Sequence, residues 1–196
     1  MHSGWGALVA VSNHTGALEV VERRRIDIAP AETPGAKQPY HFAQHLELPQ
    51  AEKFLAERFA SSKYMALAAL QDVLLELRNH QYRVVASAVL EASGRPLPPL
   101  PKILGSHPLI HSAEGEFFRK VFSKACEALK ISVVGLRERN LEECMKTVFG
   151  EKANRIQQEI SNLGGSLGPP WTKDQKTAAL AAIILLSRSQ KVIPAE

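Results

Sequence analysis

The feature that most constrains the fold is a carboxylate at one end of each of two apolar segments far apart in the sequence. The first segment, Tyr82–Leu90, is nearly all apolar and is followed by Glu91. Such a run predicts a central strand covered on both faces. The second, Thr172–Leu186, predicts a helix with Asp174 in its first turn. The two acids could therefore meet at one edge of a sheet, where carboxylates can bind a divalent metal.

Composition is that of an ordinary globular protein. The chain has 196 residues, of which 45% are hydrophobic and 22% charged. Its formal net charge of +4 permits nucleic-acid binding without requiring it. No run of about eighteen apolar residues occurs, so we expect no membrane span. Cys126 and Cys144 lack the spacing of a disulfide framework, which favours reduced thiols in a cytoplasmic protein.

The first half of the chain predicts a hairpin and a long helix. Gly4–Ser12 and Leu18–Ile28 are strand-like runs on either side of a turn at Asn13–Gly16. Tyr40–Leu48 is expected to add a third, weaker strand. Apolar residues at helical spacing then predict a helix over Pro49–Arg78.

The second half alternates helices and strands. The expected elements are a proline-rich loop at Ser93–Pro101, a helix through Phe117–Leu129, a strand at Ile131–Leu136, a helix opened by a capping box at Asn140, a helix at Ala153–Leu163 and a last helix over residues 172–188. A leading antiparallel hairpin followed by this alternation predicts an α/β fold, with a mixed sheet and helices on both faces. We expect a single domain, 1–196, with a helical excursion at residues 140–170.

The order and spacing of four segments resemble the RuvC-type Holliday-junction resolvases, which have a ribonuclease H-like fold. The segments are Ser3–Gly6, similar to the family's first strand, Val84–Glu91, similar to the strand that ends in its catalytic glutamate, Ile131–Arg137, similar to its fifth strand, and Asp174–Leu180, similar to its closing motif. Two further phrases, His107–Glu116 and Gly168–Lys176, have no counterpart in that family and indicate a separate bacterial group.

The resemblance implies a nuclease in which four acids hold two Mg²⁺ or Mn²⁺ ions that activate water. Glu91 and Asp174 match two of these acids. Thr177 stands where the closing motif should have another, and the first-strand acid would lie upstream of Met1. Either the natural protein begins further upstream, or the site is degenerate. Because such resolvases usually pair, the resemblance also implies a homodimer.

Each of the two acids also has a purely structural explanation. Glu91 could close the strand and pair with Arg95. Asp174 lies in a first helical turn, where the helix dipole favours any acid. The sequence leaves both interpretations open.

A second group of candidate ligands lies on one helical face. His107 and His111 are four residues apart, and Glu114 follows three residues later. This face could complete a metal site beside the strand carboxylate, with imidazole replacing a lost acid. The alternative is a polar face, or a buried histidine bonded to a carbonyl. His41 and His45 have the same spacing, and we expect them to be a solvated pair.

Basic residues provide candidate phosphate contacts. Arg23 and Arg25 belong to a basic cluster on the second strand, which could contact nucleic acid or could form a solvated hairpin face. Lys173 and Lys176 flank the second acid and fit phosphate binding there.

Three functional hypotheses remain. The first is a metal-dependent phosphodiesterase acting on DNA or RNA, with Glu91, Asp174 and one or both of His111 and Glu114 as ligands. The second is a catalytically inactive relative that binds nucleic acid or a protein. The third is a kinase or ATPase role on the same fold. The sequence has no Gly-rich phosphate loop, which argues against the third.

Overall fold

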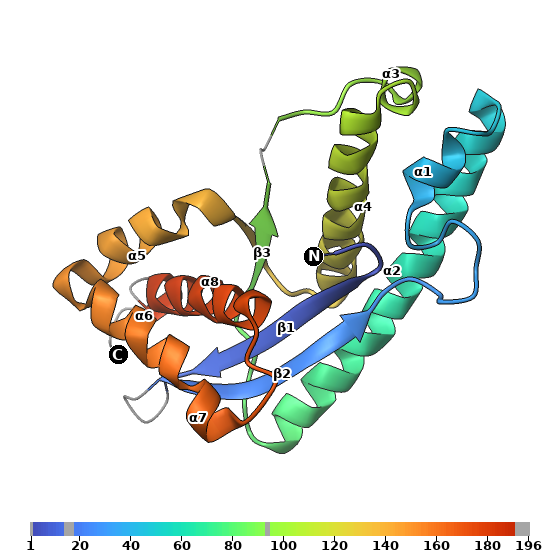
Figure 1. Ribbon diagram of the computed structural model, residues 1–196. Coiled ribbons are helices and arrows are strands. Elements are labelled where there is room, and N and C mark those ends of the chain that lie inside the picture. Colours follow the sequence, from blue (N-terminus) through green and yellow to red (C-terminus); the bar gives the residue numbers. More distant parts are fainter. Residues whose placement is uncertain (1, 14–17, 93–94, 191–196) are drawn as a thin grey trace. The chain divides into compact units, whose positions relative to one another are not determined.

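The computed structural model describes residues 2–13, 18–92 and 95–190 (Figure 1). These residues divide into two compact units. Unit 1 comprises Met1–Gly6, Arg25–Val73 and Ser93–Lys130. Unit 2 comprises Ala7–Arg24, Leu74–Ala92 and Ile131–Glu196. Each unit has its own buried apolar clusters.

The predicted hairpin is confirmed. Strand β1 (Trp5–Ser12) pairs with β2 (Glu19–Asp27), and the two run in opposite directions (Figure 1). The predicted turn at Asn13–Gly16 lies largely outside the described residues. In unit 2, Val9 and Val11, which alternate along β1, pack with Ile183 of the last helix. This alternation is the period of two that a strand imposes on its side chains.

A second sheet consists of a parallel pair. Strand β3 (Ser87–Glu91) pairs with β4 (Val133–Arg137), which places Glu91 opposite Arg137. The predicted strand from Tyr82 is too long, because the ladder begins where Ser87 faces Val133. In the described part of the chain the strands form two separate two-stranded sheets. The fold is therefore mixed α/β.

The helices of unit 1 include two short ones that the sequence did not predict. They are α1 (Pro39–Ala43), the N-terminal part of α2 (Leu48–Asn79), α3 (Leu100–Leu104) and α4 (His107–Ala128). The expected third strand at Tyr40–Leu48 is wrong. Pro39 stands in the first turn of α1 and fixes a helical φ, and fully buried Ala43 packs against Ala51 and Leu55 of α2. The expected helices over Pro49–Arg78 and through Phe117 are confirmed.

The end of the proline-rich connector is also helical. The connector was expected to be a loop to Pro101, but Leu100 and Pro101 open α3. Residues 93 and 94 at its start lie outside the described residues. Ile103 of α3 is buried with Ile110 and Ala113 of α4, so this short helix covers one side of α4.

Unit 2 contains the remaining helices. They are α5 (Leu141–Phe149), α6 (Ala153–Asn162), α7 (Gly164–Leu167) and α8 (Lys173–Gln190), with 3₁₀ turns at Glu138–Asn140 and Gly150–Lys152. The expected helices at 153–163 and 172–188 are confirmed. Helix α8 packs against β3, α5 and α6, and Ile184 is fully buried with Leu136 and Met145. Among the described residues, no helix is both long and apolar enough to cross a membrane.

The capping box occurs at α8 rather than at α5. The side chain of Asn140 makes no capping hydrogen bond, so that prediction is wrong. At α8, the Gln175 N–H donates to Thr172 Oγ1 (3.3 Å), and the Thr172 N–H donates to Gln175 Oε1 (2.9 Å). These reciprocal bonds satisfy two backbone donors at the start of the helix that carries Asp174.

Replacing Thr172 by Ala should lower the free energy of unfolding by about 0.5–2 kcal/mol, the usual effect of losing an N-cap hydroxyl. Urea denaturation followed by circular dichroism measures the change. Thr177→Ala is the matched control, because the Thr177 hydroxyl only donates to Lys173 O within the same helix. Equal stability of the two variants would show that the box contributes nothing.

Replacing Gly35 by Ala should destabilise the docking of α1 by about 1–3 kcal/mol. Gly35 has a φ of +71°, and a Cβ there would lie 2.6 Å from Phe42 Cβ. Phe42 of α1 stacks on Phe54 of α2 with ring centroids 4.6 Å apart, so it cannot easily move. Gly105→Ala, with negative φ and ordinary contacts, is the control in the same denaturation experiment. Similar effects of both substitutions would contradict the prediction.

Candidate metal centre

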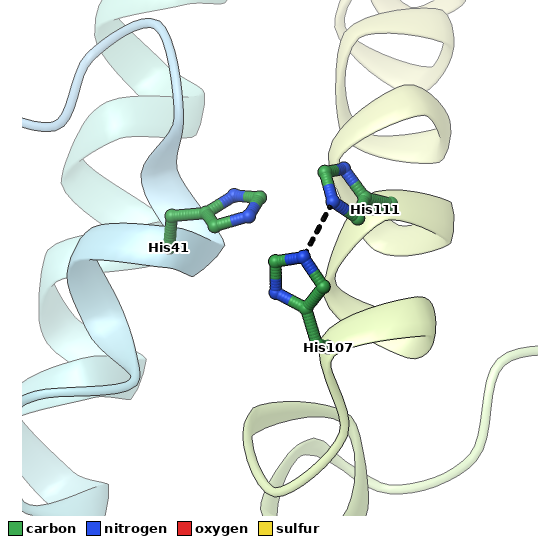
Figure 2. A group of neighbouring side chains, drawn as sticks. All are labelled: His41, His107 and His111. Carbon is green, nitrogen blue, oxygen red and sulfur yellow. Dashed lines mark hydrogen bonds between the residues drawn. The ribbon is translucent and has the colours of Figure 1, made fainter.

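Three imidazoles from two helices of unit 1 converge on one point (Figure 2). His41 comes from α1, whereas His107 and His111 come from α4. One ring nitrogen of each lies within 4.8 Å of the others, and His107 Nε2 is 3.0 Å from His111 Nε2. The His41 ring centroid is 4.8 Å from that of His111 and 5.5 Å from that of His107. Within 2–13, 18–92 and 95–190, no other three His, Cys, Asp or Glu side chains are grouped so that they could hold a metal ion.

The local sequence explains how the three rings meet. His107 and His111 are one turn apart at the start of α4, so their side chains share a face. His41 faces them because α1 and α4 are packed together: the Tyr40 ring lies edge-on to Phe117 at 6.2 Å. The site is thus built by one regular helix and one short helix docked on it.

Glu114, two turns after His107, ties α1 to α4. Its Oε1 accepts the backbone N–H of Tyr40 (2.9 Å) and of His41 (3.0 Å), and lies 3.2 Å from His41 Nδ1. Gln38, at the N-cap position of α1, makes no side-chain capping bond. Glu114 therefore supplies the cap of α1 from another helix, satisfying N–H groups that a helix start leaves without partners.

The environment of Glu114 is unusually apolar for a carboxylate. The residue is only 5% exposed, and its Oε2 is buried without a hydrogen-bond partner among the described residues. Burial raises the pKa of Glu114, an effect opposed by the hydrogen bonds from His41 and Tyr40. Burial, with the nearby charges of Glu114 and Glu116, also raises the pKa of Tyr40.

This donor set suits a divalent metal. His41 is half-buried, while His107 and His111 are exposed, so solvent reaches the cluster from one side. Three protein donors are the number found in catalytic zinc sites, where a further position is open to water or substrate. His111, which the sequence offered as a ligand beside Glu91, lies in this cluster of imidazoles, and its role as a ligand stays a prediction. The structure places Glu114 beside His41 as a hydrogen-bond partner.

The two acids predicted from the strand and helix tips lie in unit 2. Glu91 is exposed at the end of β3, and its carboxylate lies over Gly135, where a Cβ would be 2.0 Å from Glu91 Oε1. Asp174 is half-buried in the first turn of α8, a helix that packs against β3. Neither belongs to a group of three or more potential metal ligands in the described part of the chain. Their role as ligands stays a prediction.

The basic residues singled out in the sequence are largely engaged within the protein. The Arg23 guanidinium donates to the carbonyls of Leu167 and Pro170. Arg25 pairs with Asp27 (2.8 Å) and lies 4.3 Å from the centroid of the Trp5 ring.

The two candidate lysines differ in exposure. Lys173 is exposed, while Lys176 is half-buried on the following turn of α8. Phosphate binding by Arg23, Arg25, Lys173 or Lys176 stays a prediction.

His41 is the residue that the sequence analysis missed. It was expected to form a solvated pair with His45, but only His45 is exposed; His41 contacts Glu114 and the two histidines of α4. The spacing of His107, His111 and Glu114 did reveal their common face. The equal spacing of His41 and His45 did not reveal this role, because the position of His41 depends on a contact between α1 and α4, which are far apart in the sequence.

Comparisons with protein-family models, with curated proteins and with solved structures find no match. The resemblance to RuvC-type resolvases therefore stays a prediction.

In the metal-free protein, Glu114 should make stability fall with rising pH. Because its pKa is raised in the folded state, the folded protein binds more protons than the unfolded chain between the ordinary value of 4.5 and the raised value. The free energy of unfolding contributed by this group therefore decreases as pH rises through that window.

Urea denaturation at a series of pH values, compared between the wild type and Glu114→Gln, isolates the contribution of Glu114. The variant should lack the decrease, whereas the control Glu116→Gln should keep it. If the free energy of unfolding of the wild type instead rose with pH relative to that of Glu114→Gln, this result would contradict a pKa raised by burial.

Proposed function

We propose that this chain is a divalent-metal-dependent phosphodiesterase that acts on nucleic acid. The observation that carries the proposal is the convergence of His41, His107 and His111 with solvent access. Three protein donors leave coordination positions for water and substrate. A divalent ion held there would activate water and neutralise negative charge on a phosphodiester.

Two features favour nucleic acid as the substrate. The net charge of +4 favours a polyanion. The second feature is the resemblance to RuvC-type resolvases, which cleave nucleic acid. Three structural features are in line with that resemblance: the leading hairpin, the parallel pair in which β3 ends in Glu91, and the packing of α8 on β3. A ribonuclease H-like fold and a homodimer, as in that family, are part of the proposal.

The acids form a separate part of this proposal. Glu91 and Asp174 offer oxygen donors, which Mg²⁺ and Mn²⁺ prefer. The resemblance assigns such ions to these two positions. The histidine centre and the acids are thus distinct sets of ligands, with different donor chemistry, that mutations can separate.

A second candidate function is a catalytically inactive module that binds nucleic acid or a protein. One observation favours it: neither Glu91 nor Asp174 belongs to a group of three or more potential metal ligands in the described part of the chain. This candidate predicts binding of nucleic acid that weakens steeply with salt and does not depend on metal.

Cleavage assays with labelled four-way DNA junctions, single-stranded DNA and RNA test the proposal. Metal-stripped full-length protein should cleave at least one substrate when a divalent metal is restored. Loss of a group that only holds a metal ligand in place typically slows an enzyme roughly 10- to 100-fold. His107→Ala and His111→Ala each remove a direct ligand, so each should slow cleavage by at least that much. His45→Ala, which changes an exposed histidine outside the cluster, should keep full activity.

The variant Glu91→Gln separates the two sets of ligands. Lost cleavage in Glu91→Gln with normal cleavage in His107→Ala would assign catalysis to the acids and remove the histidine centre from the mechanism. Salt-sensitive binding with no cleavage under any metal would favour the second candidate function.

A further inference from the structure

The donor atoms of the histidine centre are all nitrogens. Within the described ranges, the group that could hold a metal contains three imidazoles and no carboxylate. The adjacent carboxylate oxygen, Glu114 Oε1, is already used by the N–H groups of Tyr40 and His41. Imidazole suits zinc, copper, iron and nickel, whereas Mg²⁺ and Ca²⁺ require oxygen ligands. The donor chemistry therefore selects a transition metal.

Glu114 determines which nitrogen of His41 can bind that metal. Its Oε1 lies 3.2 Å from His41 Nδ1. A carboxylate accepts hydrogen bonds, so Nδ1 carries the proton and the lone pair of the neutral ring is on Nε2. Figure 2 shows the His41 ring directed toward His107 and His111, whose own Nε2 atoms are 3.0 Å apart.

The same oxygen also fixes the backbone that carries His41. By accepting the N–H groups of Tyr40 and His41, Glu114 holds the first turn of α1 against α4, the helix that supplies both other ligands. One side chain thus sets the ring orientation of His41 and the position of its Cα. Metal-binding histidines are commonly held in this way by a carboxylate on the second ring nitrogen.

A capping role alone does not explain the burial of this carboxylate. Glu114 is 5% exposed, and its Oε2 is buried with no hydrogen-bond partner in the described part of the chain. An exposed Ser, Thr, Asp or Asn at the N-cap would serve α1 without that desolvation.

We propose that His41, His107 and His111 form a zinc-class transition-metal site, and that Glu114 is the positioning residue that presents His41 through Nε2. This inference rests on the proposed function in one respect, because both use the same three histidines as a metal centre. Metal binding at that centre does not require cleavage. Zn²⁺, Co²⁺ and Ni²⁺ belong to this class, whereas Mg²⁺ does not bind at the site.

Metal titrations of the full, metal-stripped chain test the proposal. Co²⁺ binding is followed by its visible absorption, Zn²⁺ binding by competition with a chromophoric chelator, and Mg²⁺ binding by calorimetry. The wild type should bind one Co²⁺ or Zn²⁺ per chain at this centre, with Mg²⁺ unable to displace it. His107→Ala should abolish the Co²⁺ signal, and His45→Ala should leave it unchanged.

Glu114→Gln tests the positioning role. The amide oxygen can still accept the N–H groups of α1, so the circular dichroism spectrum of the metal-free variant should match that of the wild type. Zn²⁺ affinity should fall about 10- to 100-fold, because the charge on the Nδ1 side of His41 is lost. Glu116→Gln, which changes a neighbouring glutamate that pairs with Arg119 (3.2 Å), is the matched control and should not alter affinity.

Three results would overturn the inference. They are absence of Zn²⁺ and Co²⁺ binding, equal Zn²⁺ affinity in Glu114→Gln and Glu116→Gln, and ¹⁵N shifts that place the metal on His41 Nδ1. Tight metal binding without cleavage would refute only the proposed function. Cleavage with Mg²⁺ alone, in a protein that binds no Zn²⁺ or Co²⁺, would refute only this inference.

Discussion

The hydrogen bonds from the start of α1 to Glu114 Oε1 are the interaction on which the histidine centre depends. Helix α1 has only five residues, too few to be stable alone. Its first N–H groups find their acceptor on α4, and its buried face packs on α2 through Ala43. Once α1 is placed in this way, His41 lies beside His107 and His111. The geometry of the site follows from a helix cap supplied by a residue 73 positions further along the chain.

Regular elements with a clear period could be predicted from the sequence. The apolar stripe of α2, the strand-like runs on either side of the hairpin turn and the apolar run of α8 each indicate their structure from local sequence alone. The strand from Tyr82 shows the limit of this reasoning, because a strand extends only as far as its partner does. Its apolar residues before Ser87 have no counterpart on β4, and Val85 is left 49% exposed. Similarly, the segment that begins at Asn140 has the sequence of a capping box but makes no side-chain capping bond. The reciprocal bonds form instead between Thr172 and Gln175.

The residues of the candidate site that lie on one helix could be predicted from the sequence, whereas the residue contributed by a second helix could not. His107, His111 and Glu114 share a face of α4, which the spacing alone indicates. His41 enters the site through the docking of α1, and a strand had been expected there. The acids Glu91 and Asp174 were predicted from element tips and family resemblance. The structure puts them at such tips in unit 2, while the group of ligands that it brings together is a set of imidazoles in unit 1. The histidine cluster and the predicted acid site differ in ligand type, and the acid site stays a prediction.

The most direct test of this account is X-ray absorption at the zinc edge of the zinc-loaded full-length protein. The account predicts three imidazole nitrogens at about 2.0–2.1 Å, completed by a light donor from solvent. The multiple-scattering signal of imidazole should drop by one ring in His41→Ala and stay unchanged in His45→Ala. A shell of oxygen donors without imidazole scattering, or zinc lost on gel filtration, would contradict the claim that these three histidines form a metal centre.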